Sequence, residues 1–364
     1  MRIGILTFQF ASNYGALLQA YALRETLKSM GHEAEIVNYV SDFCLKAYSA
    51  NPFAHLPDIK SCVSFALRLP HYCSQKSYFD RFRHEELEIY SKAICHKEEL
   101  TEYLMKFDTV VIGSDQVWNP ELINGDTTYF ADFADQIACV SYAAGIGMSD
   151  ALTPLQLEKL QRNLKNFKYI SLRESAAVAL LQTFVPETVR IAPDPVFLLP
   201  PEKWRKLAEV PTKFDGHKKY IFYYSLGGKR NPRLTDSTIK CSEKYGLPIV
   251  ASHPASKKNC ISGKQAYKAG PKEFLHMVLN AEIVCSDSFH ALAFCALFGK
   301  KAFIVPKNPQ DSRIISLIGN LGMDISENGF YAFDTCADKV AYERRNGYSV
   351  IQEMLHAVLA ESEL

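Results

Sequence analysis

Short apolar segments alternate with longer helix-like segments along almost the whole chain, and this alternation limits the possible fold more than any other feature. Residues 2–8, RIGILTF, have the continuous apolar pattern of a buried strand. Residues 12–32 place apolar side chains at helical spacing, and Gly31 is where that helix is expected to end. Residues 33–40, EAEIVNYV, are a second predicted strand. A strand, a helix and a strand within about 40 residues predict a β-α-β unit and therefore a parallel sheet.

The same alternation continues toward the C-terminus. Further strands are predicted at 108–113, 137–144, 219–228 and 281–286, and helices within 57–106 and at 153–166, 175–183, 271–280 and 340–361. Two such series predict an α/β fold of two doubly wound, Rossmann-like domains that face each other across a cleft. The chain has 364 residues, which is enough for two domains with separate cores.

A proline-rich segment separates the two series. Residues 190–204 contain Pro193, Pro195, Pro200 and Pro201, and proline at this density predicts a stiff segment without regular structure. We therefore expect an N-terminal domain at 1–195, a linker at 196–218, a second domain at 219–340 and a C-terminal helix at 341–364 that packs back on the first domain.

Composition and charge exclude several function classes. Hydrophobic residues make up 48% of the chain and aromatic residues 12%, which excludes a disordered protein. The 41 basic and 40 acidic residues give a net charge of +1, which offers no support for nucleic-acid binding, although local cations can still hold a small anion. The ten cysteines include no Cys-x-x-Cys pair and no zinc pattern, so we expect buried free thiols in a cytoplasmic protein, and no metal.

Residues 57–83 mix apolar, aromatic and basic side chains and have two interpretations. Such a segment can lie on a membrane surface, or it can be a core-packing helix with a solvated basic face. The pattern favours the core helix. The chain contains no stretch of 18 uncharged apolar residues, so we expect no membrane span.

Two loops after predicted strands of the first domain have the chemistry of a sugar site, because ligands bind beyond the carboxyl ends of parallel strands. In residues 10–21, Asn13 can cap a helix, Gly15 permits close backbone approach, and Tyr14 and Gln19 offer a stacking face and hydrogen bonds; the alternative is ordinary capping. In GSDQVWNP, residues 113–120, an aromatic ring stands beside polar groups that can orient hydroxyls.

The interpretation of GSDQVWNP as a functional loop competes with a simple structural one. Asp115 is a plausible general base for a hydroxyl nucleophile, and Gly113, Ser114 and Trp118 are candidate acceptor-binding residues. The alternative is a surface turn with Trp118 buried underneath. The sequence favours the functional interpretation, because the chain has only two tryptophans and one of them stands among these polar residues.

Three other strand-end loops suit an anion. Arg173, in ISLRES, can fork onto a carboxylate or phosphate, or it can form a salt bridge near Glu174 or with Asp194. Tyr224 and Ser225 end the first strand of the second domain. In SDSFH, Ser286, Asp287 and Ser288 open a helix whose N-terminus suits an anion, followed by Phe289 and His290. His290 can add charge or donate a proton, although a lone histidine is more often structural.

Six segments taken together resemble the polysaccharide pyruvyl transferase family. They are ASNYGALLQAYAL, VVIGSDQVWNP, SLRES, APDPVFLL, YYSL and SDSFHALAFCALFGKKAF, and in order they span about 2–335. The resemblance implies a two-domain fold like that of GT-B glycosyltransferases. It also implies transfer of the enolpyruvyl unit of phosphoenolpyruvate to a sugar, giving a pyruvate ketal.

The resemblance assigns roles to some of these residues and leaves one position in doubt. It implies that Arg173 and His290 belong to a basic donor site, and the chemistry needs no cofactor besides phosphoenolpyruvate as donor. Some members carry an arginine two residues before this histidine, where this chain has Ser288. Arg313 and Lys264 are the candidates to supply that charge.

The remaining expectations concern the acceptor and the competing functions. The acceptor should bind on the side of the first domain, and in such families it can be a lipid-linked oligosaccharide at the inner face of the membrane, which 57–83 would approach. One alternative is a GT-B glycosyltransferase that uses a nucleotide sugar, although no acidic residue is placed for a ribose in YYSLGG. Another is a saccharide-binding protein without turnover.

Overall fold

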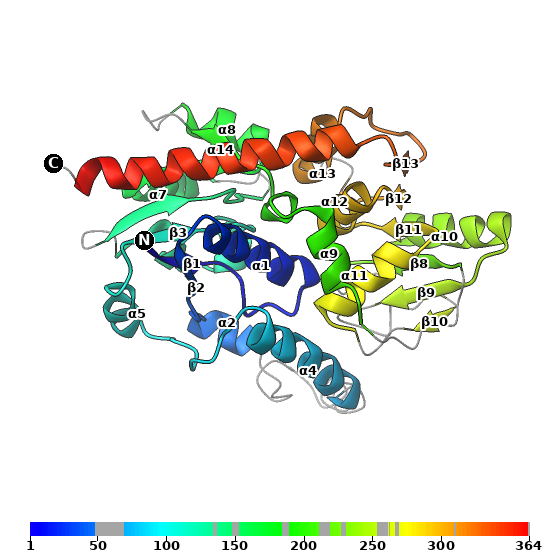
Figure 1. Ribbon diagram of the computed structural model, residues 1–364, viewed down its shortest axis with the longest axis horizontal. Helices are drawn as coiled ribbons and strands as arrows, with labels where there is room; N and C mark the ends of the chain where they lie inside the picture. The colour runs from blue at the N-terminus through cyan, green and yellow to red at the C-terminus, as the bar shows by residue number, and fades with distance from the viewer. Residues whose placement is uncertain are drawn as a thin grey trace.

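A five-stranded parallel sheet forms the centre of the first half of the molecule (Figure 1). The computed structural model describes residues 1–47, 69–133, 137–147, 153–183, 189–210, 219–226, 231–252, 261, 263–265, 269–308 and 311–362. The strand order is β2-β1-β3-β4-β5, and every neighbouring pair is parallel. The strands are β1 (Arg2–Leu6), β2 (Glu33–Ile36), β3 (Thr109–Ile112), β4 (Ala138–Ser141) and β5 (Phe167–Tyr169).

Helices and a small second sheet surround these strands. The helices are α1 (Tyr14–Ser29), α2 (Asp42–Ala47), α4 (Leu69–Glu85), α5 (Lys97–Leu104), α6 (Pro120–Ile123), η2 (Thr128–Phe130), α7 (Pro154–Leu164) and α8 (Ser175–Leu181). The short strands β6 (Ser171–Leu172) and β7 (Arg190–Ile191) pair in parallel. The first strand, helix and strand therefore form the parallel unit that the sequence predicts.

A six-stranded sheet forms the centre of the second half. Its order is β10-β9-β8-β11-β12-β13, with only the last pair antiparallel. The strands are β8 (Ile221–Tyr224), β9 (Ile249–Ser252), β10 (Lys264–Gln265), β11 (Ile283–Ser286), β12 (Lys301–Ile304) and β13 (Phe330–Ala332). The helices are α10 (Pro232–Tyr245), α11 (Pro271–Asn280), α12 (Phe289–Phe298), α13 (Ser312–Asn320) and α14 (Ala337–Ser362).

The proline-rich segment contains regular structure, contrary to the sequence expectation. Residues Pro195–Phe197 form η4 and residues Pro201–Leu207 form α9. Pro195 and Pro201 each stand at the start of their helix, where the missing N–H has no intrahelical partner to lose. Proline density alone therefore does not distinguish an irregular linker from a segment in which two helices begin.

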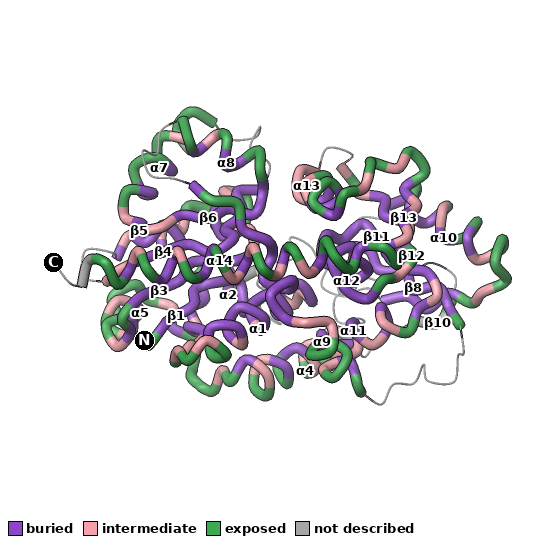
Figure 2. Tube along the Cα trace, turned by 45° about the horizontal axis from the view of Figure 1, so that its top comes forward, coloured by how far each residue is buried: buried purple, intermediate pink, exposed green. Residues whose placement is uncertain are grey.

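The two halves are packed together rather than merely tethered. Helix α14 contacts β4 and β5 of the first sheet and α12 of the second half, and it runs along one side of both halves in Figure 1. The Tyr14 ring, at the start of α1, stacks on Phe79 and Phe274, with ring centroids 5.3 and 4.7 Å away. Buried residues run through the strands of both halves in Figure 2. The predicted domain limits themselves stay a prediction.

Two further sequence expectations concern the cysteines and the membrane. Among the described cysteines, all free, six are buried as expected, whereas Cys73 is exposed. In the part of the chain that the structure describes, no helix is long and apolar enough to cross a membrane. The first part of the segment 57–83 lies outside the described residues, and its second part belongs to α4.

Candidate functional site

Arg173, Asp194 and His290 meet where the two halves join. Arg173 follows β6, Asp194 caps η4, and His290 lies in the first turn of α12. The Nη1 atom of Arg173 donates to Oδ2 of Asp194 at 2.6 Å, and Nε2 of His290 lies 3.4 Å from the same oxygen. One carboxylate therefore holds a guanidinium from the first half and an imidazole from the second.

Helix α12 brings His290 to this point because its sequence must be buried. All ten of its residues, FHALAFCALF, are buried, as expected of a helix that is apolar on every side. The Ser288 hydroxyl caps its N-terminus by accepting from the Ala291 N–H, and Gly299, with φ of 64°, ends it. Ser288 is thus used as a helix cap.

Gly15 packs directly on the His290 ring. A Cβ placed on Gly15 would lie 2.0 Å from Nδ1 of His290, so no larger residue fits there without displacing the ring. The Asn13 side chain caps α1 by accepting from the N–H groups of Gly15 and Ala16, as the sequence predicts. That cap fixes the backbone that faces the imidazole. On the other side, Phe289 contacts His290 edge to face, with centroids 5.1 Å apart.

Arg173 is buried among three carboxylates. Its Nη2 lies 3.9 Å from Oδ1 of Asp115 and its Nε lies 3.6 Å from Oε1 of Glu174, in addition to the bond with Asp194. The guanidinium also sits 4.8 Å from the centre of the Phe289 ring, a cation–π contact. The salt-bridge alternative for Arg173 is therefore confirmed, with both Glu174 and Asp194, and the anion clamp stays a prediction.

Several polar atoms of this cluster are buried without a hydrogen-bond partner among the described residues. They are Nε and Nη2 of Arg173, both carboxylate oxygens of Glu174 and Nε2 of His290. Buried polar groups are normally paired, because leaving one unpaired costs free energy. Donors and acceptors left over in one cluster are consistent with a ligand that completes them.

The charges in the cluster shift the pKa values of its carboxyl groups in opposite directions. Burial alone would raise the pKa of Asp194, but His290 and Arg173 hold this pKa at about 2. Burial raises the pKa of Glu174, although Arg173 and Arg313 oppose that rise. Burial would lower the pKa of Arg173, yet Glu174, Asp194 and Asp115 raise it, so the guanidinium stays charged.

The side chains of the cluster differ in how far they are exposed to solvent. The side chains of Asp194 and Glu174 are 0% and 1% exposed, whereas those of Asp115 and His290 are 17% and 11% exposed. Asp115 and His290 are therefore the most exposed members of the cluster, whereas Asp194 acts through the groups it binds.

Most of the predicted donor-binding residues form a frame rather than a binding surface. The Ser286 hydroxyl donates to the Tyr224 carbonyl at 2.7 Å, and the carboxylate of Asp287 accepts from the Ser225 hydroxyl and the Leu226 N–H, each at 2.7 Å. Tyr224 is itself buried in the core. These hydrogen bonds join the loops after β8 and β11. A direct contact between these atoms and a donor substrate would require the hydrogen bonds to break.

The two cations expected to replace a missing arginine stand elsewhere. Lys264 belongs to β10, which β9 and β8 separate from β11 at the edge of the sheet, and its side chain lies outside the described residues. The guanidinium of Arg313 is bound by Asp311, with distances of 3.0 and 2.7 Å from Nε and Nη2 to the two carboxylate oxygens. Arg313 therefore lines the cleft as part of an ion pair.

The predicted acceptor-binding residues of the first half are mostly buried, contrary to the expectation that they contact a sugar. Tyr14 is fully buried, and its hydroxyl lies 2.8 Å from that of Ser252. Gln19 donates to Thr7 and to the Ala16 carbonyl. Neither side chain can present a stacking face or a hydrogen bond to a sugar, because the core of the molecule already occupies both.

The GSDQVWNP loop also differs from its functional interpretation. Trp118 is 1% exposed, its Nε1 donates to the Tyr129 carbonyl at 2.7 Å, and its ring stacks on Phe130. Ser114 is buried and donates to the Ala143 carbonyl. The structural alternative, a turn with the indole underneath, is the correct one for Trp118.

Position 113 requires a glycine because the Tyr142 backbone lies close to it, and this need does not depend on a sugar. The φ of Gly113 is 111°, and a Cβ there would lie 2.5 Å from the Tyr142 carbonyl oxygen. The loop thereby turns so that Asp115, at φ of 73°, faces Arg173.

Replacing Trp118 with phenylalanine should lower the free energy of unfolding and leave sugar binding unchanged. The substitution removes the indole N–H and leaves the Tyr129 carbonyl without its donor, at a cost of about 1–3 kcal/mol. Denaturant unfolding measures the stability, and steady-state kinetics measures KM for the acceptor. A rise in that KM without a loss of stability would instead indicate that Trp118 stacks on the acceptor sugar.

A cavity of about 430 Å³ lies beside this cluster, and the sequence predicts a cleft between the two domains but not most of its lining residues. Its lining includes Gln116 and Asn119 from the first half and Lys307, Asp311 and Arg313 from the second. Asp194 was foreseen only as an ion-pair partner. The sequence signal for Asp194 and for the cavity residues is weak. Asp194 is an acid between two prolines, and the polar cavity residues belong to loops that are far apart in the sequence.

Comparison with known proteins adds the family and the fold. A model of the polysaccharide pyruvyl transferase family matches residues 13–307. No curated protein matches the chain at a significant level.

Among solved structures, UDP-N-acetylglucosamine 2-epimerase from Rickettsia bellii is similar with a TM-score of 0.57 and 13% identity over 98% of this chain and 95% of that one. HepE of Anabaena, in complex with UDP-glucose, has a TM-score of 0.54 and 7% identity over 99% and 100%. The corresponding epimerase from Neisseria meningitidis, bound to UDP-GlcNAc, has a TM-score of 0.53 and 15% identity over 98% and 99%. At these identities the likeness shows the fold alone, and it confirms the GT-B-like architecture.

Proposed function

The chain belongs to the polysaccharide pyruvyl transferase family, and we propose that it transfers the enolpyruvyl unit of phosphoenolpyruvate to a sugar of a polysaccharide precursor. The products are a pyruvate ketal and inorganic phosphate. The observation that carries the proposal is the meeting of Arg173 and His290 on Asp194, with unpaired donor atoms on the first two. A buried guanidinium beside an imidazole suits a donor that carries a carboxylate and a phosphate.

The reaction needs a proton at the methylene carbon, a base for the sugar and stabilisation of the leaving phosphate. In the proposal, His290 delivers a proton to the methylene carbon, which becomes the methyl group. One sugar hydroxyl bonds to the central carbon, Asp115 takes its proton, and the carbon–oxygen bond to phosphate breaks. The second hydroxyl then bonds to the same carbon, and its proton leaves with the phosphate. Arg173 neutralises the anionic donor during these steps.

The acceptor in this proposal is a sugar, either free or part of a lipid-linked oligosaccharide. In the lipid-linked case the protein would work as a peripheral protein at the inner membrane face.

The test measures phosphate release and the mass of the acceptor. The full chain is incubated with phosphoenolpyruvate and galactose- or N-acetylmannosamine-containing acceptors. We expect acceptor-dependent phosphate release and a mass gain equal to pyruvic acid less one water. Calorimetry with UDP and CMP addresses the nucleotide-sugar alternative, because nucleotide binding without phosphoenolpyruvate binding would support it. Acceptor binding without any product would instead indicate a saccharide-binding protein.

Replacing Glu174 with glutamine should lower KM for phosphoenolpyruvate at pH values where the Glu174 carboxyl group is ionised. Burial raises the pKa of this carboxyl group, so it takes up a proton as the pH falls and the cluster then carries one negative charge less. Donor binding should therefore weaken as pH rises through the pKa of Glu174, and the glutamine variant should lose that part of the dependence. Initial rates across a pH series measure it. An unchanged pH profile would contradict a donor site beside Glu174.

A further inference from the structure

The cavity between the halves is built from side chains that bind hydroxyl groups well. Gln116 and Asn119 come from the loop after β3, and Lys307, Asp311 and Arg313 come from the chain after β12. Amides donate and accept, carboxylates accept, and the two cations donate. Its volume of about 430 Å³ lies within the range of about 300–1,000 Å³ that is usual for small-molecule pockets.

The charge of the lining argues against an anionic occupant. Among the described residues that line the cavity, Lys307 and Arg313 are the cations, and Glu121, Asp287 and Asp311 are the acids. Each cation already has an acid beside it: Arg313 Nη2 lies 2.7 Å from Asp311, and Lys307 Nζ lies 3.8 Å from Asp287. Because both described cations of the lining are already paired, whereas Arg173 and His290 keep unpaired polar atoms, the cavity suits a neutral ligand with many hydroxyl groups better than an anion.

The cavity lies next to the reacting cluster. Gln116 directly follows Asp115, whose carboxylate is 3.9 Å from Arg173. Asp287 lies three residues before His290. The charges of Arg313 and Asp311 reach Glu174 and alter its pKa. A ligand in the cavity would therefore stand close to Asp115 and His290.

Gln116 links the two walls. With its amide oxygen facing the guanidinium, it accepts from Arg313 Nη1 at 2.7 Å, and its side chain also lies 3.1 Å from Asn119 Nδ2. Gln116 is only half-buried, so a ligand that enters the cavity meets this amide. Gln116 makes its side-chain contacts with residues of the cavity itself, which makes it a suitable residue to alter.

We propose that this cavity is the acceptor subsite and that its occupant is a neutral sugar ring, bound by hydrogen bonds from Gln116, Asn119, Lys307 and the Asp311–Arg313 pair. The inference rests on the proposed function for the identity of the second substrate. It moves the acceptor away from Tyr14, Gln19, Ser114 and Trp118, which are buried, to residues of both halves. Phosphoenolpyruvate then occupies the adjoining side, at Arg173 and His290.

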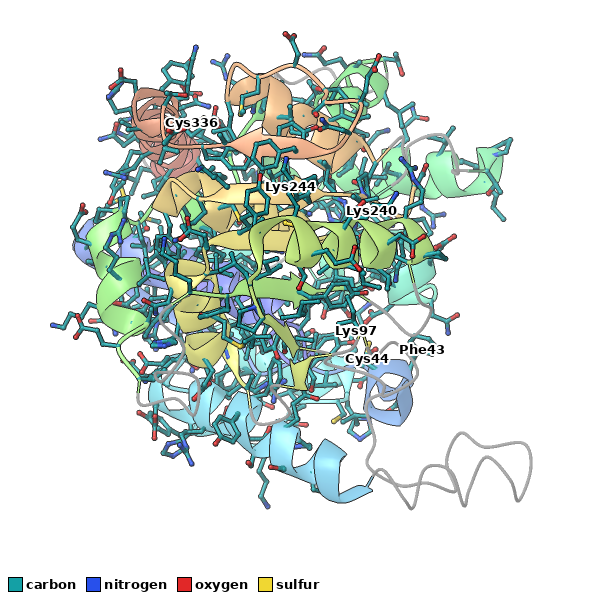
Figure 3. The ribbon with its side chains drawn as sticks, turned by 90° about the vertical axis from the view of Figure 1, so that its right-hand side faces the viewer. Phe43, Cys44, Lys97, Lys240, Lys244 and Cys336 are labelled. Carbon is teal, nitrogen blue, oxygen red and sulfur yellow. The ribbon has the colours of Figure 1, made fainter. Side chains whose placement is uncertain are left out.

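The test uses Gln116→Ala and Lys307→Gln, with Lys240→Gln as the matched control. Lys240 is exposed on α10, outside the cavity lining (Figure 3). Saturation-transfer NMR measures binding of methyl galactoside and methyl N-acetylmannosaminide to the full chain, with and without phosphoenolpyruvate. We expect at least one glycoside to bind the unaltered protein and the control equally, and to bind each cavity variant about tenfold more weakly, the loss of roughly one hydrogen bond.

Calorimetry with phosphoenolpyruvate on the same proteins separates the two substrates. Its affinity should be the same in Gln116→Ala as in the unaltered protein. Equal glycoside binding by all four proteins, binding of neither glycoside, or loss of phosphoenolpyruvate affinity in Gln116→Ala would each overturn the assignment. Failure of the proposed function looks different: the glycosides would bind through the cavity, yet no phosphate would be released from phosphoenolpyruvate.

Discussion

Replacing Arg173 with alanine is expected to lower kcat/KM for phosphoenolpyruvate by about 100- to 1,000-fold, the usual effect of removing a preorganised group that stabilises charge. It is also expected to lower the free energy of unfolding by about 3–5 kcal/mol, because one partner of a buried ion pair is lost. The guanidinium is 4% exposed and contacts Asp115, Glu174 and Asp194. Without it, the carboxylates of Asp115, Glu174 and Asp194 lose the cation that they share.

A second pair of variants separates the two effects. Arg173→Lys retains a positive charge but cannot bridge three partners, so it should fold better than the alanine variant and still lose most of the activity. Adding Asp194→Asn to Arg173→Ala removes one unpaired charge and should recover part of the stability but none of the activity. Thermal unfolding and initial rates measure both. Activity near that of the unaltered protein in Arg173→Lys would contradict a specific role for the guanidinium.

The sequence predicts the fold well because strand and helix periodicity is a local property. Residues 2–40 predict a parallel β-α-β unit, and α1, β1 and β2 form it. The loop ends also follow from local rules, since Asn13 and Ser288 cap the helices that they precede. Arg173 and His290 each follow an apolar strand, and the parallel sheets bring such ends together, but the resemblance to the family is what assigns both residues to a donor site.

Burial of individual side chains is not a local property, and the predictions on it failed. Trp118 stands in a polar loop, but Phe130 and Phe167 lie around its ring, and only the tertiary structure shows them. Tyr14 is likewise recruited into the core of the second half by Phe274. A polar loop sequence therefore does not predict which of its side chains are exposed and which are buried.

Asp194 shows the opposite case, a residue that the sequence undervalued. It lies 96 positions from His290, and its neighbours Pro193 and Pro195 suggested only a stiff connection. The structure makes it the group that joins Arg173 of the first half to His290 of the second, with its pKa held at about 2 by their charges. At every pH where the protein is expected to work, this carboxylate is therefore ionised.

Replacing Gly15 with alanine is expected to abolish most of the turnover while leaving the protein folded. The new Cβ would lie 2.0 Å from Nδ1, 2.3 Å from Cγ and 2.5 Å from Cε1 of His290, so the ring must move. Phe289 and Asp194 contact that ring, which leaves the imidazole no nearby position that keeps its contact with the carboxylate. Overpacking of this kind costs about 1–3 kcal/mol of stability.

Gly319→Ala is the matched control, because Gly319 lies in α13 and a Cβ there meets nothing within 4 Å. That variant should keep full activity and gain up to about 1 kcal/mol from the better helix propensity of alanine. For Gly15→Ala, kcat should fall far more than KM for phosphoenolpyruvate rises, since in the proposed reaction His290 delivers the proton and Arg173 binds the donor. NMR of the histidine side chains would show the displaced ring directly. Full turnover in Gly15→Ala would mean that the position of His290 does not matter to the reaction, and the proton donor would have to be another residue.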